Sequence, residues 1–161
     1  MHHPYPAPRI RDPFRLIPPV AGDHGGDQPE DLAGLRGEQD DTQQRVLLVE
    51  DEFLLSAVLT ADLRGAGYDV LGPFATVGSA MAAVQSETFD GAILDINLKG
   101  ELVYPVAEEL ARRRVPFMFL SGYARINMPE AFRAYPRLPK PANPTDLLRG
   151  VHNMLSRKPV S

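Results

Sequence analysis

From residue 45 onward, short apolar runs alternate with longer stretches in which apolar and polar residues are mixed. The runs are continuous rather than alternating, as in strands that are buried on both faces of a sheet. The predicted strands lie at residues 45–49, 68–71, 92–94 and 116–120, and only the second is interrupted, by Asp69. Strands that alternate with helices in this way predict an α/β domain with a parallel sheet covered on both faces.

The first mixed stretch, Phe53 to Arg64, has the spacing of an amphipathic helix. Its apolar residues recur at three- and four-residue steps, and they are Leu54, Leu55, Val58, Leu59 and Leu63. Gly65-Ala66-Gly67 follows directly and predicts the end of the helix.

Three further helices are predicted from their start signals. Thr76 can cap a helix that extends to about Gln85. The stretch from Glu101 to Arg114 contains Pro105, so its regular part should start close to Tyr104 or Pro105. Asn143-Pro144-Thr145-Asp146 combines a cap, a proline at the first position and an acid in the first turn, and predicts a helix to about Arg157.

The region between Ser121 and Lys140 is less regular. Only Glu130 to Tyr135 has a helical pattern there, which predicts a shortened fourth helix. Pro136 and Pro139 each remove a backbone donor, so the fifth strand should be weak. Right-handed crossovers leave few topologies, and the strand order 2-1-3-4-5 brings the ends of strands one, three, four and five together.

Composition divides the 161 residues into two parts. Residues 1–43 contain seven of the 16 prolines and five of the 13 glycines, with four Arg against eight Asp or Glu. We therefore expect a disordered or loosely packed acidic extension at 1–43 and a folded domain at 44–158. From Gln44 onward 13 basic residues balance 13 acidic ones. We therefore expect no overall positive electrostatic potential that would attract nucleic acid.

Three features of the sequence bear on the cellular location of the protein. It lacks an apolar run long enough to cross a bilayer, and its first residues lack the pattern of a secretory signal. It contains no Cys, which excludes disulfides and thiolate metal sites and fits a reducing compartment. We expect a cytoplasmic protein without membrane contact.

Polar residues whose side chains could bind a ligand or take part in a reaction follow the predicted strands. Glu50 and Asp51 follow the first strand, and Asp95 ends the third. Ser121 follows the fourth strand, and Lys140 lies between two prolines after the fifth. Taken singly, such residues are often helix caps, turn residues or solvated side chains. Together, at successive strand ends, they predict a single site at the carboxyl edge of the sheet.

Three neighbouring carboxylates repel one another, so their charge must be met by a proton or a cation. An all-oxygen set suits Mg²⁺. Aspartate is an established nucleophile for phosphoryl groups, so Asp95 could accept one while Lys140 and Ser121 contact phosphoryl oxygens.

Four motifs together resemble the signature of receiver domains of two-component response regulators. They are Val49-Glu50-Asp51-Glu52, Leu94-Asp95, Ser121-Gly122 and Lys140-Pro141. The resemblance covers about Arg45 to Arg157 and implies a flavodoxin-like, CheY-like doubly wound fold. Since only four residues follow Arg157, we expect a single-domain receiver without an effector domain.

The resemblance also implies a role for each site residue. Asp95 is the phosphoacceptor, and Ser121 and Lys140 sense the phosphoryl group. The Mg²⁺ ligands are Glu50, Asp51, Asp95 and the backbone carbonyl of Asn97. The phosphate donor is a histidine kinase or a phosphotransfer protein, and the downstream partner is not defined.

A narrower likeness lies in residues 116–123, Pro-Phe-Met-Phe-Leu-Ser-Gly-Tyr. This stretch is similar to the PFxFATGY motif of the stand-alone FATGUY receivers of alphaproteobacteria, with Leu120-Ser121 in place of Ala-Thr. That subfamily is associated with HWE and related histidine kinases and with stress signalling.

The sequence departs from typical receivers three residues before Lys140. Arg137 stands there in place of an aromatic switch residue, so signalling through an aromatic side chain of the fifth strand is not expected. Arg137 and Tyr123 are candidate tuning residues. Because the fourth helix is shortened, the usual dimer surface is reduced and a monomer is expected.

The favoured function is a phosphorelay shuttle, a phosphate sink or a phosphorylation-dependent partner, and not a classical enzyme. Two alternatives stay open. One is a receiver-fold interaction module that is not phosphorylated. The other is an aspartyl-nucleophile phosphohydrolase, which usually has a second Asp two residues after the nucleophile, where this chain has Asn97.

Overall fold

The structure of the chain, a computed structural model, describes residues 43–122 and 127–157. The extension predicted at 1–43 lies outside the described residues except for Gln43, and so does Tyr123. Among the described residues, every helix is too short or too polar to cross a membrane.

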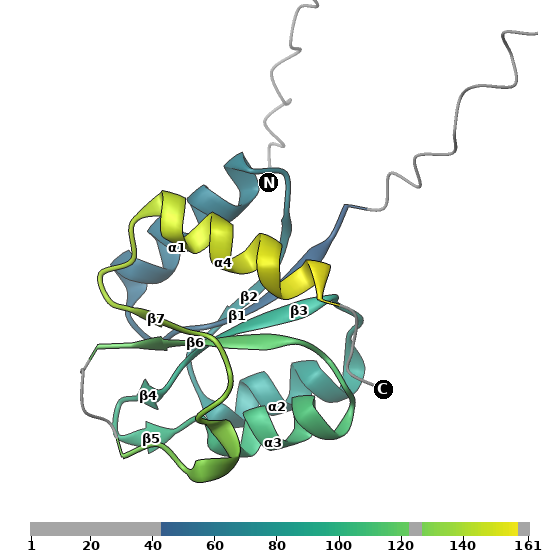
Figure 1. Cartoon of the computed structure of the whole chain (residues 1–161), viewed down its shortest axis with the longest axis vertical. Coiled ribbons are helices and arrows are strands. Elements are labelled where there is room, and N and C mark those ends of the chain that lie inside the picture. The colour runs from purple at the N-terminus through teal and green to yellow at the C-terminus, as the bar shows by residue number, and fades with distance from the viewer. Residues whose placement is uncertain (1–42, 123–126, 158–161) are drawn as a thin grey trace, which may run out of the picture. The chain divides into compact units, whose positions relative to one another are not determined.

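Five parallel strands form the central sheet (Figure 1) in the order β2-β1-β3-β6-β7. The strands are β1 (Arg45–Val49), β2 (Asp69–Phe74), β3 (Gly91–Asp95), β6 (Phe117–Ser121) and β7 (Arg137–Pro139). When the five strands of this sheet alone are numbered in chain order, the order is 2-1-3-4-5, so the predicted fold is confirmed. The reversal of order between β1 and β3 places the carboxyl ends of β1, β3 and β6 side by side.

Helices cover both faces of the sheet. In Figure 1, α1 and α4 lie on one side of the sheet, and α2 and α3 lie on the other. Their bounds are α1 Phe53–Gly65, α2 Val77–Ser86, α3 Tyr104–Arg112 and α4 Pro144–Ser156. The predicted caps are present, because Thr76 accepts a hydrogen bond from the Ser79 N–H and Asn143 accepts one from the Asp146 N–H.

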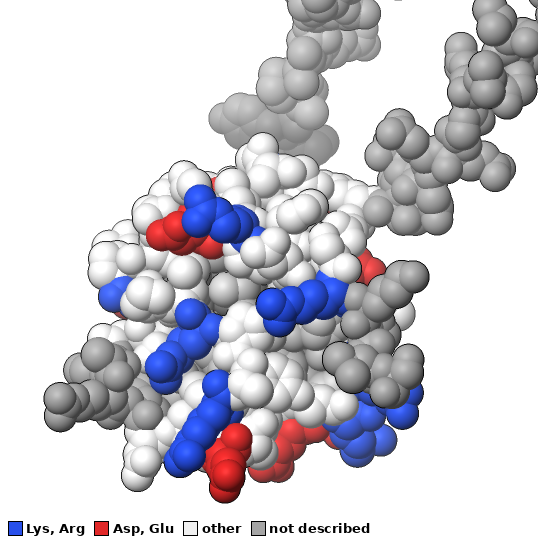
Figure 2. Space-filling model, viewed as in Figure 1, with Lys and Arg blue, Asp and Glu red and all other residues white. Residues whose placement is uncertain are grey.

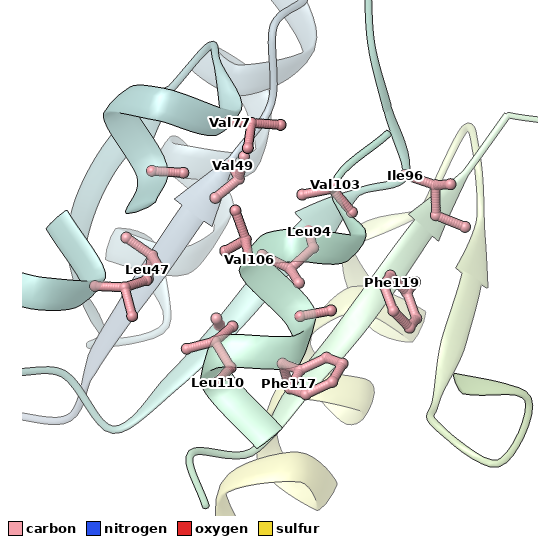
Figure 3. Close-up of a cluster of buried hydrophobic side chains, with 14 of the residues drawn as sticks. Leu47, Val49, Val77, Leu94, Ile96, Val103, Val106, Leu110, Phe117 and Phe119 are labelled. Atoms are coloured by element: carbon pink, nitrogen blue, oxygen red, sulfur yellow. The ribbon is translucent and has the colours of Figure 1, made fainter. Parts of the chain in front are cut away.

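Each strand divides its side chains between two cores, as the twofold period of a strand requires. Leu47, Leu94 and Phe117 point toward α2 and α3, where Figure 3 shows them packed near Val106 and Leu110. Their sequence neighbours belong to the second cluster, against α1 and α4, and they include Val46, Leu48, Ile93 and Met118. Both faces of the sheet are therefore buried, which accounts for the continuous apolar runs.

The segment after β3 differs from the expectation that helical structure extends from Glu101. Asn97–Leu98 (β4) and Glu101–Leu102 (β5) pair as a small antiparallel hairpin. Its two-residue turn, Lys99-Gly100, has positive φ at both positions, the pattern of a tight hairpin turn. Helix α3 therefore begins only at Tyr104, as Pro105 predicted.

The apolar positions predicted for α1 do not all face the core. Leu59 and Leu63 are buried and Leu55 is partly buried, but Leu54 and Val58 are 72% and 55% exposed. The exposed positions adjoin Phe53, which is 80% exposed. The three- and four-residue spacing therefore predicts the helix correctly, but the apolar face of α1 is wider than the part that the sheet covers.

Helical structure between β6 and β7 is reduced, as predicted. Its described part contains a single 3-10 turn, η1 (Glu130–Phe132), in place of a full helix, and β7 has three residues. The turn is held by aromatic packing, because the Phe132 ring stacks on Tyr104 with centroids 5.4 Å apart and meets Phe119 edge to face.

Candidate functional site

Four predicted site residues meet at the carboxyl edge of the sheet. Glu50 follows β1, Asp95 ends β3, Ser121 ends β6, and Lys140 follows β7. The exposed fractions of Glu50, Asp95 and Ser121 are 1%, 4% and 4%. Polar residues this deeply buried need partners, and the geometry of the edge supplies them.

Lys140 joins the two buried acids. Its Nζ lies 2.8 Å from Oε2 of Glu50 and 2.9 Å from Oδ2 of Asp95. The Lys140 backbone N–H also donates to the Ser121 carbonyl over 2.8 Å, which ties the end of β7 to the end of β6. The short fifth strand therefore still delivers its lysine to the site.

Backbone donors fix the two carboxylates on their other sides. The Glu52 N–H donates to Oε1 of Glu50 over 3.0 Å, and the Asn97 N–H donates to Oδ1 of Asp95 over 3.3 Å. Asp51 is only partly buried and completes the acidic group. One carboxylate oxygen from each of Glu50, Asp51 and Asp95 lies within 4.8 Å of the others.

The site carries more negative charge than Lys140 balances. Burial raises the pKa of the Glu50 and Asp95 carboxyls, and the hydrogen bonds from Lys140 reduce this effect without reversing it. Burial alone would lower the pKa of Lys140, but its bonds to Glu50 and Asp95 outweigh this and its pKa is raised. The carboxylates therefore favour an additional cation or a proton.

A cavity of about 420 Å³ opens beside these residues. It is lined by Asp51, Glu52, Asp95, Asn97, Lys99, Gly100, Gly122 and Lys140. Lys99 was not among the predicted site residues. The signal for its position is the Lys99-Gly100 pair between Leu98 and Glu101, since a glycine-containing dipeptide between short segments is typical of a hairpin turn.

Arg137, proposed as a tuning residue, does not line this cavity. It lies on β7, is exposed and lines a separate cavity with Asn127, Met128, Arg133 and Tyr135. Its positive charge acts on Tyr104, whose pKa is raised by burial and lowered to a smaller extent by Arg137. The structure thus separates Arg137 from the acidic group.

The residues at this edge fit a divalent cation with oxygen ligands. Three carboxylates from Glu50, Asp51 and Asp95 converge, and the nearby cavity leaves room for water or a phosphoryl oxygen. Mg²⁺ prefers a few carboxylates together with waters and phosphate oxygens. The arrangement can therefore bring a cation, a carboxylate nucleophile and a fixed ammonium group to one phosphoryl group.

The structure resembles several solved domains of one class. SdrG from Sphingomonas melonis is 36% identical, with a TM-score of 0.63 over 70% of this chain and 97% of that chain. The signal receiver domain of a modulated diguanylate cyclase from Desulfovibrio desulfuricans is 30% identical, with a TM-score of 0.61 over 70% and 94% of the two chains. A CheY-like response regulator receiver domain protein from Methanospirillum hungatei is 27% identical, with a TM-score of 0.63 over 71% and 94%.

Sequence comparison identifies a curated relative as well. The transcriptional regulatory protein PdtaR of Mycobacterium tuberculosis is 28% identical over 118 residues, which are 71% of this chain. The chain spans 58% of the length of PdtaR. No protein-family profile matches the chain.

A doubly wound fold with its polar site at the switch point of a 2-1-3-4-5 sheet defines the CheY-like class. With the identity and coverage of the solved receivers added, the chain belongs to the receiver-domain family of response regulators.

Proposed function

We propose that this chain is a receiver that accepts one phosphoryl group on Asp95 in a Mg²⁺-dependent reaction. The observation that supports this most is the convergence of the Glu50, Asp51 and Asp95 carboxylates beside Lys140, at a cavity that reaches Asp95. A buried group of acids contributes little to stability, because desolvation opposes its ionisation. Its presence is better explained by ligand chemistry.

In the proposed step, a carboxylate oxygen of Asp95 attacks phosphorus and the bond to the donor breaks. The Asn97 N–H and Lys140 hold the Asp95 carboxylate by both oxygens, so that little reorientation is needed before attack. Lys140 then lies within reach of a phosphoryl oxygen, and the hydroxyl of Ser121, at the end of the adjacent strand, is the second proposed donor.

Mg²⁺ is the proposed cofactor. Glu50, Asp51, Asp95 and the backbone carbonyl of Asn97 would hold it. When bound, it would supply positive charge to the phosphoryl oxygens. The raised carboxyl pKa values of Glu50 and Asp95 support this assignment, because burial disfavours the ionised forms more than Lys140 favours them, and a bound cation would favour those forms further.

The proposed donor is a histidine kinase or a phosphotransfer protein, and the proposed setting is two-component signalling in the cytoplasm. Support comes from the fold class and from SdrG, which has also been solved in a BeF3-activated conformation. The similarity of residues 116–123 to the FATGUY motif favours kinases of the HWE and related types and a role in stress signalling. Within that setting the chain would act as a shuttle, a sink or a phosphorylation-dependent partner.

The test is intact-mass spectrometry of the full chain with acetyl phosphate and Mg²⁺. The expected result is addition of a single phosphoryl group, lost in Asp95→Asn and in the presence of a chelator. Glu108→Gln, at an exposed position of α3, is the control and should be modified like the wild type. Failure of the wild type to gain mass, under conditions that phosphorylate a known receiver, would contradict the proposal.

A further inference from the structure

The hairpin after β3 places a second lysine at the cavity beside Asp95. Lys99 and Gly100 form the turn between β4 and β5, with φ values of 52° and 93°. The Gly100 N–H donates to Oδ1 of Asn97 over 2.6 Å, which closes the turn onto the residue that also holds Asp95. The position of Lys99 is thus fixed only four residues after the proposed phosphoacceptor.

The two lysines of the cavity differ in their surroundings. The ammonium group of Lys140 is occupied by Glu50 and Asp95 at the base of the site, and its side chain is 17% exposed. Lys99 is exposed, and among residues 43–122 and 127–157 no carboxylate lies within ion-pair distance of its Nζ. A lysine that lines an acidic cavity without such a partner is available to an anionic ligand.

The geometry of the transfer determines which part of a donor Lys99 would meet. Asp95 is 4% exposed and lies deep in the site, so phosphorus must approach it from the open side of the cavity. In an in-line displacement the leaving oxygen lies opposite the attacking oxygen. The leaving group therefore points away from Asp95, toward the exposed rim to which Lys99 belongs.

We propose that Lys99 binds the leaving group of small acyl phosphate donors and stabilises the negative charge that develops on its oxygen. This inference rests on the proposed function. In the step, a bond forms between an Asp95 oxygen and phosphorus, and the bond from phosphorus to the acyl oxygen breaks. The electron pair stays on that oxygen, the product is a carboxylate anion, and no proton is required.

The proposal distinguishes two kinds of phosphoryl donor. Acetyl phosphate releases an anion, whereas phosphoramidate and phosphohistidine release a nitrogen leaving group that departs neutral after protonation. An ammonium group at the rim stabilises the first transition state and gives no such help to the second. Lys99 should therefore favour charging of the receiver by acyl phosphates over charging by N-phosphoryl donors.

The test compares initial phosphorylation rates of the full chain with acetyl phosphate and with phosphoramidate, both with Mg²⁺. Lys99→Gln should lower the rate with acetyl phosphate by about five- to tenfold, the effect of one partly solvated charge contact. The rate with phosphoramidate should change by less than about twofold. Lys99→Arg keeps the charge and should restore most of the rate with acetyl phosphate.

Two further variants exclude structural explanations. Lys99→Asn is also neutral and suits a turn position with positive φ, so it should reproduce Lys99→Gln if the lost charge is the cause. Arg149→Gln removes one positive charge from the exposed surface of α4 and should leave both rates unchanged.

Equal losses with both donors, or no loss with acetyl phosphate, would overturn the role of Lys99 while leaving Asp95 as acceptor. Absence of phosphorylation of the wild type by either donor would instead overturn the proposed function, and the inference with it. A loss confined to acetyl phosphate that Lys99→Arg restores would support the role of Lys99.

Discussion

Asp95 combines burial with an incompletely balanced charge. Its carboxylate contacts Lys140 Nζ at 2.9 Å, yet burial raises its pKa, and the charge of Asp51 adds to the increase. A carboxyl group with a raised pKa in the folded state stabilises the fold below its ordinary pKa. That contribution is lost as the pH rises through the folded-state value.

Neutralising Asp95 should therefore stabilise the metal-free protein. In the presence of a chelator, Asp95→Asn should raise the free energy of unfolding at pH 7 by more than the roughly 0.5 kcal/mol typical of a neutral surface substitution, because the asparagine does not need to ionise in a buried site. The difference should shrink as the pH approaches the ordinary pKa of 3.8, where Asp95 of the wild type is itself increasingly protonated. Urea unfolding followed by circular dichroism measures both effects.

The control for this prediction is Glu108→Gln, which removes a carboxylate from an exposed position of α3. It should change the unfolding free energy by no more than about 0.5 kcal/mol. An Asp95→Asn protein that is less stable than the wild type at neutral pH without metal would show that the carboxylate is adequately compensated. The site would then need no added cation to balance its charge.

Among the elements, edge strand β2 depends on one glycine. Gly72 has a φ of 108°, and a Cβ at this position would lie 2.7 Å from the Leu48 carbonyl oxygen and 2.9 Å from the Phe74 nitrogen. Both contacts are with backbone atoms, which cannot rotate away. The bulge in the register between β1 and β2 lies at this point of the ladder.

Gly72→Ala should therefore destabilise the fold by at least about 2 kcal/mol, since it combines a strained φ with a backbone clash. Gly78→Ala is the matched control, because Gly78 lies in α2 and its added Cβ would meet nothing within 4 Å. It should stabilise by up to about 1 kcal/mol. Thermal or urea unfolding measures the stability of both variants. A Gly72→Ala protein as stable as the wild type would contradict the described path of β2.

The elements also show what the sequence could and could not predict. The strand ends were predictable because apolar runs stop at Val49, Leu94 and Leu120, next to polar residues, and the topology then brought these ends together. The β4–β5 hairpin was missed because Glu101 and Leu102 form only two residues of strand before a helical pattern begins. Strands of two residues are too short to show a periodic pattern, so the position of Lys99 at the cavity could not be predicted either.

Helix α1 shows a different limit. Spacing identified the helix, but its apolar stripe is wider than the surface against which it packs, and no period distinguishes a covered leucine from an exposed one. Phe53, Leu54 and Val58 are more than half exposed and form what we call the α1 surface. It begins two residues after Asp51, next to the acidic site.

At the scale of the whole molecule, charges and apolar groups are distributed unevenly. On the face seen in Figure 2, Lys and Arg side chains lie in separate groups, several of them beside Asp or Glu, rather than in one continuous stripe. The α1 surface offers exposed apolar residues beside the site, as protein interfaces do at their centres. A protein donor that brings its phosphoryl group to Asp95 would meet this surface.

Leu54→Glu should therefore impair phosphorylation by a protein and leave small donors unaffected. We expect the rate of transfer from a cognate histidine kinase, identified by phosphotransfer profiling, to fall by about tenfold or more, since truncated interface anchors cost above about 1 kcal/mol. The rate with acetyl phosphate should stay within about twofold. Radiolabel transfer for the kinase and intact mass for acetyl phosphate provide the two measurements.

Leu102→Glu is the matched control, because Leu102 is 47% exposed on β5, outside the α1 surface. It should transfer phosphate from the kinase like the wild type. If Leu54→Glu and Leu102→Glu behave alike, or if Leu54→Glu slows acetyl phosphate as well, the α1 surface is not the place where the donor protein binds.

The most direct test of the account locates the phosphoryl group itself. An aspartyl phosphate is reduced by borohydride to homoserine, which peptide mass spectrometry assigns to a single position. After incubation of the full chain with acetyl phosphate and Mg²⁺, the account predicts homoserine at position 95 alone, and none when a chelator replaces the metal. Homoserine at Asp51 or at another Asp, or metal-independent modification of Asp95, would contradict it.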